Sequence, residues 1–312
     1  MSESNQMRPI TLSIAAVERD TGLTKDTLRV WERRYGFPVP QRDGLTERAY
    51  PLEQVEKLRI IKRLMDAGHR PGRIVSQSIA ELERLRDSSL GVADAVVGSN
   101  RAKPDLRPYI DLIRAHDVEA LRRQLQQAQL QLGLGRFVID LVSPLNTLVG
   151  DTWMRGHLEI FEEHLYTESI QALLRNAIAS IPLPAAANRP RVLLTTFPSE
   201  PHGIGLLMAE SLLLLEGCRS ISLGVQTPAW DIVLAATAQR ADIVALSFTS
   251  VLSPGAVTEG LMELREKLPR SVEIWAGGSA PVLHRRPVPG VTALASLEQI
   301  GDEVQRWRTE RS

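Results

Sequence analysis

One short stretch of the sequence combines an imidazole, a carboxylate and glycine. Glu200, His202 and Gly205 lie between an apolar, β-rich segment at residues 191–196 and an apolar, helix-like segment at residues 206–213. This order predicts that His202 lies on a turn at the carboxyl end of a strand in an open α/β sheet, where such sheets bind ligands. A neutral imidazole can coordinate a metal, and a carboxylate two residues away can orient its other ring nitrogen. We therefore expect a metal or cofactor site around His202.

Two further strand ends carry hydroxyls or paired glycines. The strands predicted at residues 243–248 and 274–276 end at the same edge of the sheet as the His202 turn. Each segment alone is compatible with an ordinary turn, but together they converge on one edge. The residues concerned are Ser247, Thr249, Ser250, Gly277 and Gly278.

A third group of residues lies in a helical stretch before the sheet. On one unbroken helix Trp153 and His164 would share a face about 16 Å apart, at ~1.5 Å per residue. A break at Gly156 would bring them closer, around one pocket with Glu163. A core tryptophan beside surface Glu and His side chains is the alternative interpretation.

The N-terminal segment carries residue types that contact DNA. Two short helices joined by a tight turn at Gly22, the second capped by Thr24, predict a helix-turn-helix. Val30 and Trp31 are expected to pack inward. A Pro- and Gly-rich segment at residues 37–50 predicts a wing. The residue types suited to phosphates and base edges are Thr24, Lys25, Thr27, Arg29 and Arg33 on the second helix and Arg42 and Arg48 on the wing.

Charge and composition exclude several classes of protein. Lys plus Arg and Asp plus Glu both number 37, so net charge points to no partner. Residues 1–85 hold fifteen basic and twelve acidic side chains, a net +3 that an ordinary solvated helical surface could also carry. The single cysteine excludes an internal disulfide framework and a cysteine zinc cluster. The polar N-terminus does not read as a signal peptide, and no apolar run reaches the ~18–20 residues of a membrane span. A cytoplasmic location is expected.

The periodicity of apolar residues divides the 312 residues into three structured parts and a linker. The expected domains are a winged helix-turn-helix at residues 1–85, a polar linker at 86–107, a four-helix bundle at 108–187 and an α/β domain at 188–312. Alternating strands and helices in the last predict a doubly wound, flavodoxin-like parallel sheet. Its expected strands are residues 192–196, 221–225, 243–248 and 274–276, and the expected bundle helices are residues 109–115, 117–132, 134–153 and 158–181.

The N-terminal segment resembles a known family of regulators. The run from Thr27 to Phe37, which includes Tyr35, and the later Pro40, Arg42, Arg48 and Tyr50 are similar to the winged helix-turn-helix of MerR-family proteins. The similarity covers about residues 12–67 and is strongest to the branch of CarH/LitR photoreceptors and MlrA-type regulators. It implies binding to double-stranded operator DNA, with Tyr35 among the DNA-facing residues. It also implies a homo-oligomer, a dimer or tetramer. Because no long coiled coil follows, assembly is expected to depend on the rest of the chain.

The C-terminal motifs resemble a cobalamin-binding domain. These motifs are similar to those of the domain shared by methionine synthase and base-off mutases. They are the pattern Glu200-x-His202-x-x-Gly205, the hydroxyl-bearing segment from Ser247 to Ser250, and the pair Gly277-Gly278. The resemblance implies that His202 is the lower axial ligand of cobalt, with the cofactor's tail in a slot lined by the Ser/Thr and Gly-Gly segments. The pattern Trp153-x9-Glu163-His164 is similar to the motif that shields the upper, adenosyl face in CarH-type proteins. The implied cofactor-binding set is Trp153, Glu163, His164, Glu200, His202, Gly205, Ser247, Thr249, Ser250, Gly277 and Gly278.

The chain departs from this family at one position. CarH-type proteins typically place a His directly after the motif Trp, and that His takes the upper cobalt position after photolysis. Here the position is Met154. A thioether is a soft ligand and a poor match for Co(III). His157, one turn on, is the candidate substitute.

The combined expectation is a light-responsive regulator, acting as a repressor, that binds adenosylcobalamin and operator DNA. Photolysis of the Co–C bond would change the oligomeric state and the affinity for DNA together. A light-independent cobalamin sensor and a cofactor-independent MerR-type regulator are the alternatives. A cobalamin-dependent enzyme is disfavoured because no segment remains for a substrate-binding barrel.

Overall fold

The computed structural model describes residues 11–42, 48–66, 69–89, 104–182 and 189–311. The chain forms two compact units, residues 1–98 with 154–157, and residues 99–153 with 158–312. Most of the predicted linker at residues 86–107 lies outside the described residues, and the domain boundaries stay predictions. No helix among the described residues is both long and apolar enough to span a membrane.

The first unit is the predicted helix-turn-helix with a wing. Ser13 and Thr24 cap the first two helices through side-chain oxygens, and Gly22 and Gly36 end them in the left-handed conformation. The strands pair antiparallel in the order β1-β3-β2. The elements are β1 (Thr11–Ser13), α1 (Ile14–Thr21), α2 (Lys25–Tyr35), β2 (Gln41–Arg42), β3 (Arg48–Pro51), α3 (Leu52–Asp66), α4 (Pro71–Ile74) and α5 (Ile79–Ser89).

The core of this unit corrects one prediction. Leu28 and Trp31 are buried and lie three residues apart on one face of α2. Val30 was expected to pack inward beside them, but 41% of its side chain is exposed. The reason is helical periodicity, because Val30 is rotated by about 200° from Leu28 at ~100° per residue.

The bundle contains the expected helical stretches with one irregularity. Residues 134–153, expected as one helix, are interrupted by a π-helical segment, η1 (Phe137–Val142). The predicted break near Gly156 is confirmed, because Gly156 has a φ of 71° and lies between the helices on either side. The bundle elements are α6 (Arg107–Arg114), α7 (Val118–Leu132), α8 (Leu134–Arg136), η1, α9 (Ser143–Met154) and α10 (Ile160–Ser180).

The C-terminal part is the predicted doubly wound sheet. Its strands are all parallel and lie in the order β5-β4-β6-β7-β8. The short strand β8 and helix α14 were not predicted. The elements are β4 (Arg191–Thr195), α11 (Ile204–Leu215), β5 (Arg219–Gly224), α12 (Ala229–Ala238), β6 (Ile243–Phe248), α13 (Pro254–Lys267), β7 (Glu273–Gly278), α14 (Val282–Arg285), β8 (Thr292–Ala293) and α15 (Gln299–Glu310).

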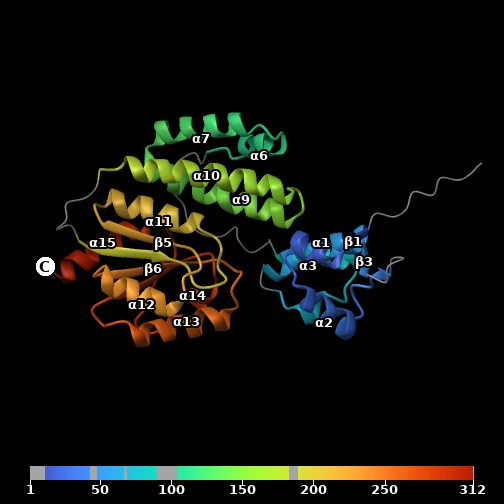
Figure 1. Ribbon diagram of the computed structural model, residues 1–312. Coiled ribbons are helices and arrows are strands. Elements are labelled where there is room, and N and C mark those ends of the chain that lie inside the picture. The colour runs from blue at the N-terminus through green and yellow to red at the C-terminus, as the bar shows by residue number, and fades with distance from the viewer. Residues whose placement is uncertain (1–10, 43–47, 67–68, 90–103, 183–188, 312) are drawn as a thin grey trace, which may run out of the picture. The chain divides into compact units, whose positions relative to one another are not determined.

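Two hydrophobic layers cover the faces of this sheet. Helices α12, α13 and α14 pack on one face. On the other face α11 and α15 share a continuous core with the bundle helices. This core includes Phe137 and Tyr166 of the bundle and Trp275 of β7. Figure 1 shows α10 lying along α11, so the bundle is attached to the sheet through these two helices.

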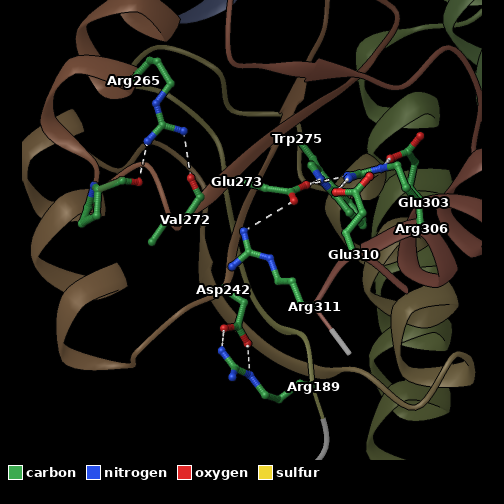
Figure 2. A network of polar contacts seen from close by, with 11 residues as sticks. Arg189, Asp242, Arg265, Val272, Glu273, Trp275, Glu303, Arg306, Glu310 and Arg311 are labelled. Atoms are coloured by element: carbon green, nitrogen blue, oxygen red, sulfur yellow. Dashed lines mark hydrogen bonds and ion pairs between the residues drawn. The ribbon is translucent and has the colours of Figure 1, made fainter. Parts of the chain in front are cut away.

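A network of ion pairs ties the amino ends of the strands to α15. Glu273, the first residue of β7, accepts from Arg306 Nη2 at 2.6 Å and lies 3.7 Å from Arg311 Nη2 (Figure 2). Asp242, just before β6, pairs with both nitrogens of the Arg189 fork. These charges lie at the opposite end of the strands from the His202 turn and leave the carboxyl edge to other residues.

Candidate functional site

The carboxylate of Glu200 is the centre of the candidate site. Its side chain is completely buried after β4, where it contacts His202 on its own turn and Thr249 after β6. One carboxylate oxygen lies 2.7 Å from His202 Nδ1. The other accepts from the Thr249 backbone N–H at 2.7 Å and from the Thr249 hydroxyl at 2.8 Å. Glu200 therefore joins the ends of two neighbouring strands.

The topology explains why these two loops meet. The chain leaves β4 toward β5 on one side, whereas β6 lies on the other side of β4. This reversal of strand order makes the carboxyl ends of β4 and β6 a topological switch point, which is where open α/β sheets bind ligands. The predicted meeting of the His202 turn with the hydroxyl-bearing segment after β6 occurs there through Thr249.

The ionisation of Glu200 fixes the direction of its hydrogen bond with the imidazole. Burial acts to raise the pKa of Glu200, but hydrogen bonds from His202 and Thr249 favour the charged form and bring its pKa below the ordinary value. An ionised carboxylate only accepts hydrogen bonds, so His202 donates from Nδ1. When the imidazole is neutral, this arrangement places its lone pair on Nε2, and the side chain is 54% exposed.

This donor set suits a metal that brings most of its own ligands. Among the residues that the structure describes, no group of three or more His, Cys, Asp or Glu side chains could hold a metal ion. A single oriented imidazole at a ligand-binding edge is instead suited to an axial position on a metal held in a macrocycle. The residues present therefore fit the implied cobalamin.

The predicted glycines have packing reasons for being glycine. A Cβ at Gly205 would lie 2.4 Å from the Ser247 hydroxyl, so this position lets α11 approach β6 closely. Gly278 has a φ of 113°, and a Cβ there would lie 2.1 Å from the Phe248 carbonyl oxygen. Gly277, paired with Ser247 across the sheet, has room for a Cβ. Gly205 and Gly278 therefore shape the edge, and their contact with a cofactor, like that of Ser250, stays a prediction.

The residues predicted for the upper face lie at the α9–α10 break. Trp153 is next to last in α9 and packs against the bundle core, and Met154 ends that helix. In α10 Glu163 accepts from the Thr167 hydroxyl at 2.6 Å and lies 3.7 Å from His164 Nε2. His164 is 69% exposed, and His157, between the helices, is also exposed.

One polar cluster beside the break was missed from the sequence. Glu162 is buried and completes a capping box by accepting from the Glu159 backbone N–H at 2.7 Å. It also lies 2.9 Å from His116 Nε2, whose ring packs at 5.1 Å on Phe161. Glu159 is not one of the preferred N-cap residues, so the capping box had only a weak signal in the sequence. The link to His116, 46 residues earlier, has no local signal.

The predicted DNA-facing residues whose side chains the structure describes lie at exposed or partly exposed positions. Thr24 caps α2 and bonds to Thr27, so both serve the helix start. Three basic residues make weak surface ion pairs, which phosphates can replace. The side chain of Arg42 lies outside the described residues, Arg33 is exposed and Tyr35 is partly buried. The ion pairs are Lys25–Glu18 at 3.6 Å, Arg29–Asp26 at 3.3 Å and Arg48–Glu32 at 3.1 Å.

Two family models match the chain in the order that the fold suggests. Residues 12–75 match the MerR HTH family regulatory protein model. Residues 106–177, which form the bundle, match the B12 binding domain model.

Individual relatives cover most of the chain. The HTH-type transcriptional repressor CarH of Myxococcus xanthus is 31% identical over 85% of this chain and 87% of its own length. The repressor CarA of the same organism is 32% identical over 78% of this chain and 79% of its own length. Both are named as repressors, which agrees with the prediction of a regulator and not an enzyme.

A solved structure, the monomethylamine corrinoid protein of Methanosarcina barkeri, covers 64% of this chain and 96% of its own at 16% identity. Its TM-score is 0.49. The chain belongs to the CarH-type family of regulators, which join a MerR helix-turn-helix to a B12-binding domain.

Proposed function

We propose that this protein is a light-responsive transcriptional repressor that binds adenosylcobalamin and operator DNA. The family supports both binding functions, and the names of the two Myxococcus relatives support repression. A regulator of this kind acts where the DNA is, so a cytoplasmic location is part of the proposal.

The proposal of a bound cofactor rests on the hydrogen bonds that join Glu200 to His202 and to Thr249, which we call the Glu200 array. In the proposal His202 would hold the cobalt through Nε2, while Glu200 and Thr249 fix the ring from the Nδ1 side. Trp153, Glu163 and His164 would cover the adenosyl group, as in the motif of the family. When bound, the cofactor would supply a light-sensitive Co–C bond, and the protein's task is to make two conformations differ in their affinity for it.

The DNA half depends on coupling between the two units of the chain. A ligand shifts a conformational equilibrium only by its differential affinity for the states. In the proposal the cofactor in the dark favours an oligomer, a dimer or tetramer, whose helix-turn-helix units bind the operator together. Loss of the adenosyl group removes that preference, so oligomerisation and DNA affinity fall together.

The deciding experiment uses the full chain purified without cofactor and then loaded in the dark with adenosylcobalamin. We expect the absorbance spectrum of a nitrogen-ligated cobalamin, operator binding in a mobility-shift assay, and loss of both oligomer and shifted DNA after green light. Absence of cofactor binding would contradict the proposal. Binding that leaves DNA affinity unchanged in light would instead identify a light-independent cobalamin sensor, and equal DNA binding without cofactor would identify a cofactor-independent regulator.

A second experiment tests the DNA-binding surface. Arg29→Ala removes a half-exposed cation from α2 and should weaken operator binding, with the salt dependence falling by about one charge. Arg123→Ala, in the bundle helix α7, removes a similarly paired surface arginine and is the matched control. Equal affinities for the two variants in a salt titration would show that α2 does not face the DNA.

A further inference from the structure

The hydroxyl of Thr196 connects two tight turns beneath the candidate site. Thr196 directly follows β4 and is completely buried. Its hydroxyl donates to the Glu200 backbone carbonyl at 2.6 Å and accepts from the Gln226 backbone N–H at 2.8 Å. Gln226 lies in the loop between β5 and α12, so one side chain bridges the loops after neighbouring strands.

Both turns contain a residue in an unfavourable backbone conformation. Ser199 has a φ of 68° and Gln226 a φ of 61°, in the left-handed region that favours glycine. Such residues persist only where the surrounding structure fixes them, and they gather at functional sites. The Thr196 hydroxyl binds the amide of one strained residue and the carbonyl next to the other.

Glu200 is therefore held both through its side chain and through its backbone, by residues of different loops. Its carboxylate is held by Thr249 in the loop after β6, and its backbone carbonyl is held by Thr196, which also bonds the loop after β5. Because the same carboxylate orients His202 Nδ1, a shift of the Glu200 backbone moves the imidazole.

We propose that Thr196 is a positioning residue for His202, and that it sets how completely the imidazole coordinates the metal of a bound cobalamin. This inference rests on the proposed function. It adds a residue that makes no contact with the cofactor and that acts through Glu200. A purely structural role for a buried threonine would change the stability of the protein and leave the coordination of bound cofactor unaltered.

The test replaces the hydroxyl with a methyl group in Thr196→Val and restores it in Thr196→Ser, both in the full chain. The probe is cob(II)alamin, whose electron paramagnetic resonance spectrum is split by a nitrogen lower ligand, with the dissociation constant measured alongside. In Thr196→Val we expect a smaller nitrogen-ligated fraction and a roughly tenfold weaker affinity, which is the usual effect of an outer-shell change. Thr196→Ser should return both to the wild-type values. If the valine variant does not fold, Thr196→Ala makes the same test.

Two threonines serve as controls. The hydroxyl of Thr237 donates to the carbonyl of Val233 in its own helix, so Thr237→Val should behave as wild type. Thr195 joins the same two strands by bonding Gly224 and Thr227 but makes no bond to Glu200, and Thr195→Val should keep the nitrogen splitting.

Three results would overturn the inference. They are a wild-type spectrum in Thr196→Val, a weaker affinity with an unchanged nitrogen-ligated fraction, and an equal loss of splitting in Thr195→Val. The failure of the proposed function is recognised separately. If the wild-type protein shows no nitrogen splitting, or keeps it in His202→Ala, then His202 is not the ligand and the proposed cofactor site itself is wrong.

Discussion

The His202 turn and the α9–α10 break both carry residues predicted to face the cofactor, but their side chains are held in different ways. At the turn, Glu200 is completely buried and is bonded by residues from two loops, while its backbone is bonded to a third through Thr196. At the break, His164 is 69% exposed, and Glu163 takes its hydrogen bond from Thr167 on its own helix.

This difference separates a rigid site from an adjustable one. A side chain fixed by buried hydrogen bonds from several elements keeps its geometry when the ligand changes, because moving it would leave buried polar groups unpaired. Exposed side chains near a helix start can change rotamer at little cost. We therefore expect the residues around His202, which we call the lower face of the site, to hold their geometry before the cofactor binds. The residues at the α9–α10 break, the upper face of the site, should adapt to the group that they cover.

The largest expected effect is that of His202→Ala. Because changes in the outer shell of a metal ligand typically cost 10–100-fold in affinity, removing the ligand itself should weaken cobalamin binding by at least ~100-fold. The nitrogen-ligated spectrum should disappear while the apoprotein keeps its circular dichroism. His284→Ala, at an exposed position on α14, is the matched control. Wild-type affinity in His202→Ala would show that the lower face does not depend on this residue.

Glu200→Gln tests the rigidity of the lower face. The amide keeps the shape of the side chain but loses the charge and one acceptor, so it can satisfy His202 or Thr249 less well. We expect cobalamin affinity to fall ~10–100-fold. Glu210, another buried glutamate, accepts from Ser220 at the amino end of β5, away from the carboxyl edge of the sheet, and Glu210→Gln should bind normally. If both variants bind alike, the Glu200 array is only a packing feature.

The lower face was also the more predictable one from the sequence. Strand periodicity and turn glycines placed His202 and Thr249 at the same edge, because parallel strands bring their carboxyl ends together. Residues 243–248 are β6 as predicted, since an apolar run of β-formers between turn signals has few alternatives. The sequence did not reveal the packing role of Gly205, which depends on how closely α11 approaches β6, or that of Gly278, which depends on how closely β7 approaches Phe248 of β6.

The upper face could be predicted only in outline. A break near Gly156 followed from the glycine, but the π-helical segment at residues 137–142 depends on packing that no local pattern encodes. The contact of His116 with Glu162 joins segments 46 residues apart. Val30 was expected in the core because it is apolar, but its position on the helix turns it away from the buried face of Leu28 and Trp31.

His116→Ala tests whether the upper face depends on this distant contact. His116 Nε2 lies 2.9 Å from Glu162, whose carboxylate also caps α10 one residue before Glu163. Because His116 is 54% exposed, the pair contributes little, ~0.2–1 kcal/mol, or up to about fivefold in affinity. We expect a loss of that size for adenosylcobalamin and none for cobalamin with a small upper ligand. His116→Gln, which can still donate, should restore binding. An equal loss for both cofactors would mean that the contact supports the fold as a whole.

The smallest effect on dark binding is expected for Met154→His, which nevertheless separates the two faces most directly. In the dark the upper position is filled by the adenosyl group, so a new histidine should leave affinity unchanged. After green light the wild-type protein has Met154 where the family has a nitrogen ligand, and a thioether binds Co(III) poorly. We therefore expect the wild-type photoproduct to have one nitrogen ligand on cobalt and to lose cobalamin on a desalting column. The photoproduct of Met154→His should have two nitrogen ligands and should retain its cobalamin. If the wild-type photoproduct already has two, His157→Ala should remove the second. If that variant keeps both, the α9–α10 break does not lie over the metal, and the adjustable upper face must be sought elsewhere in the bundle.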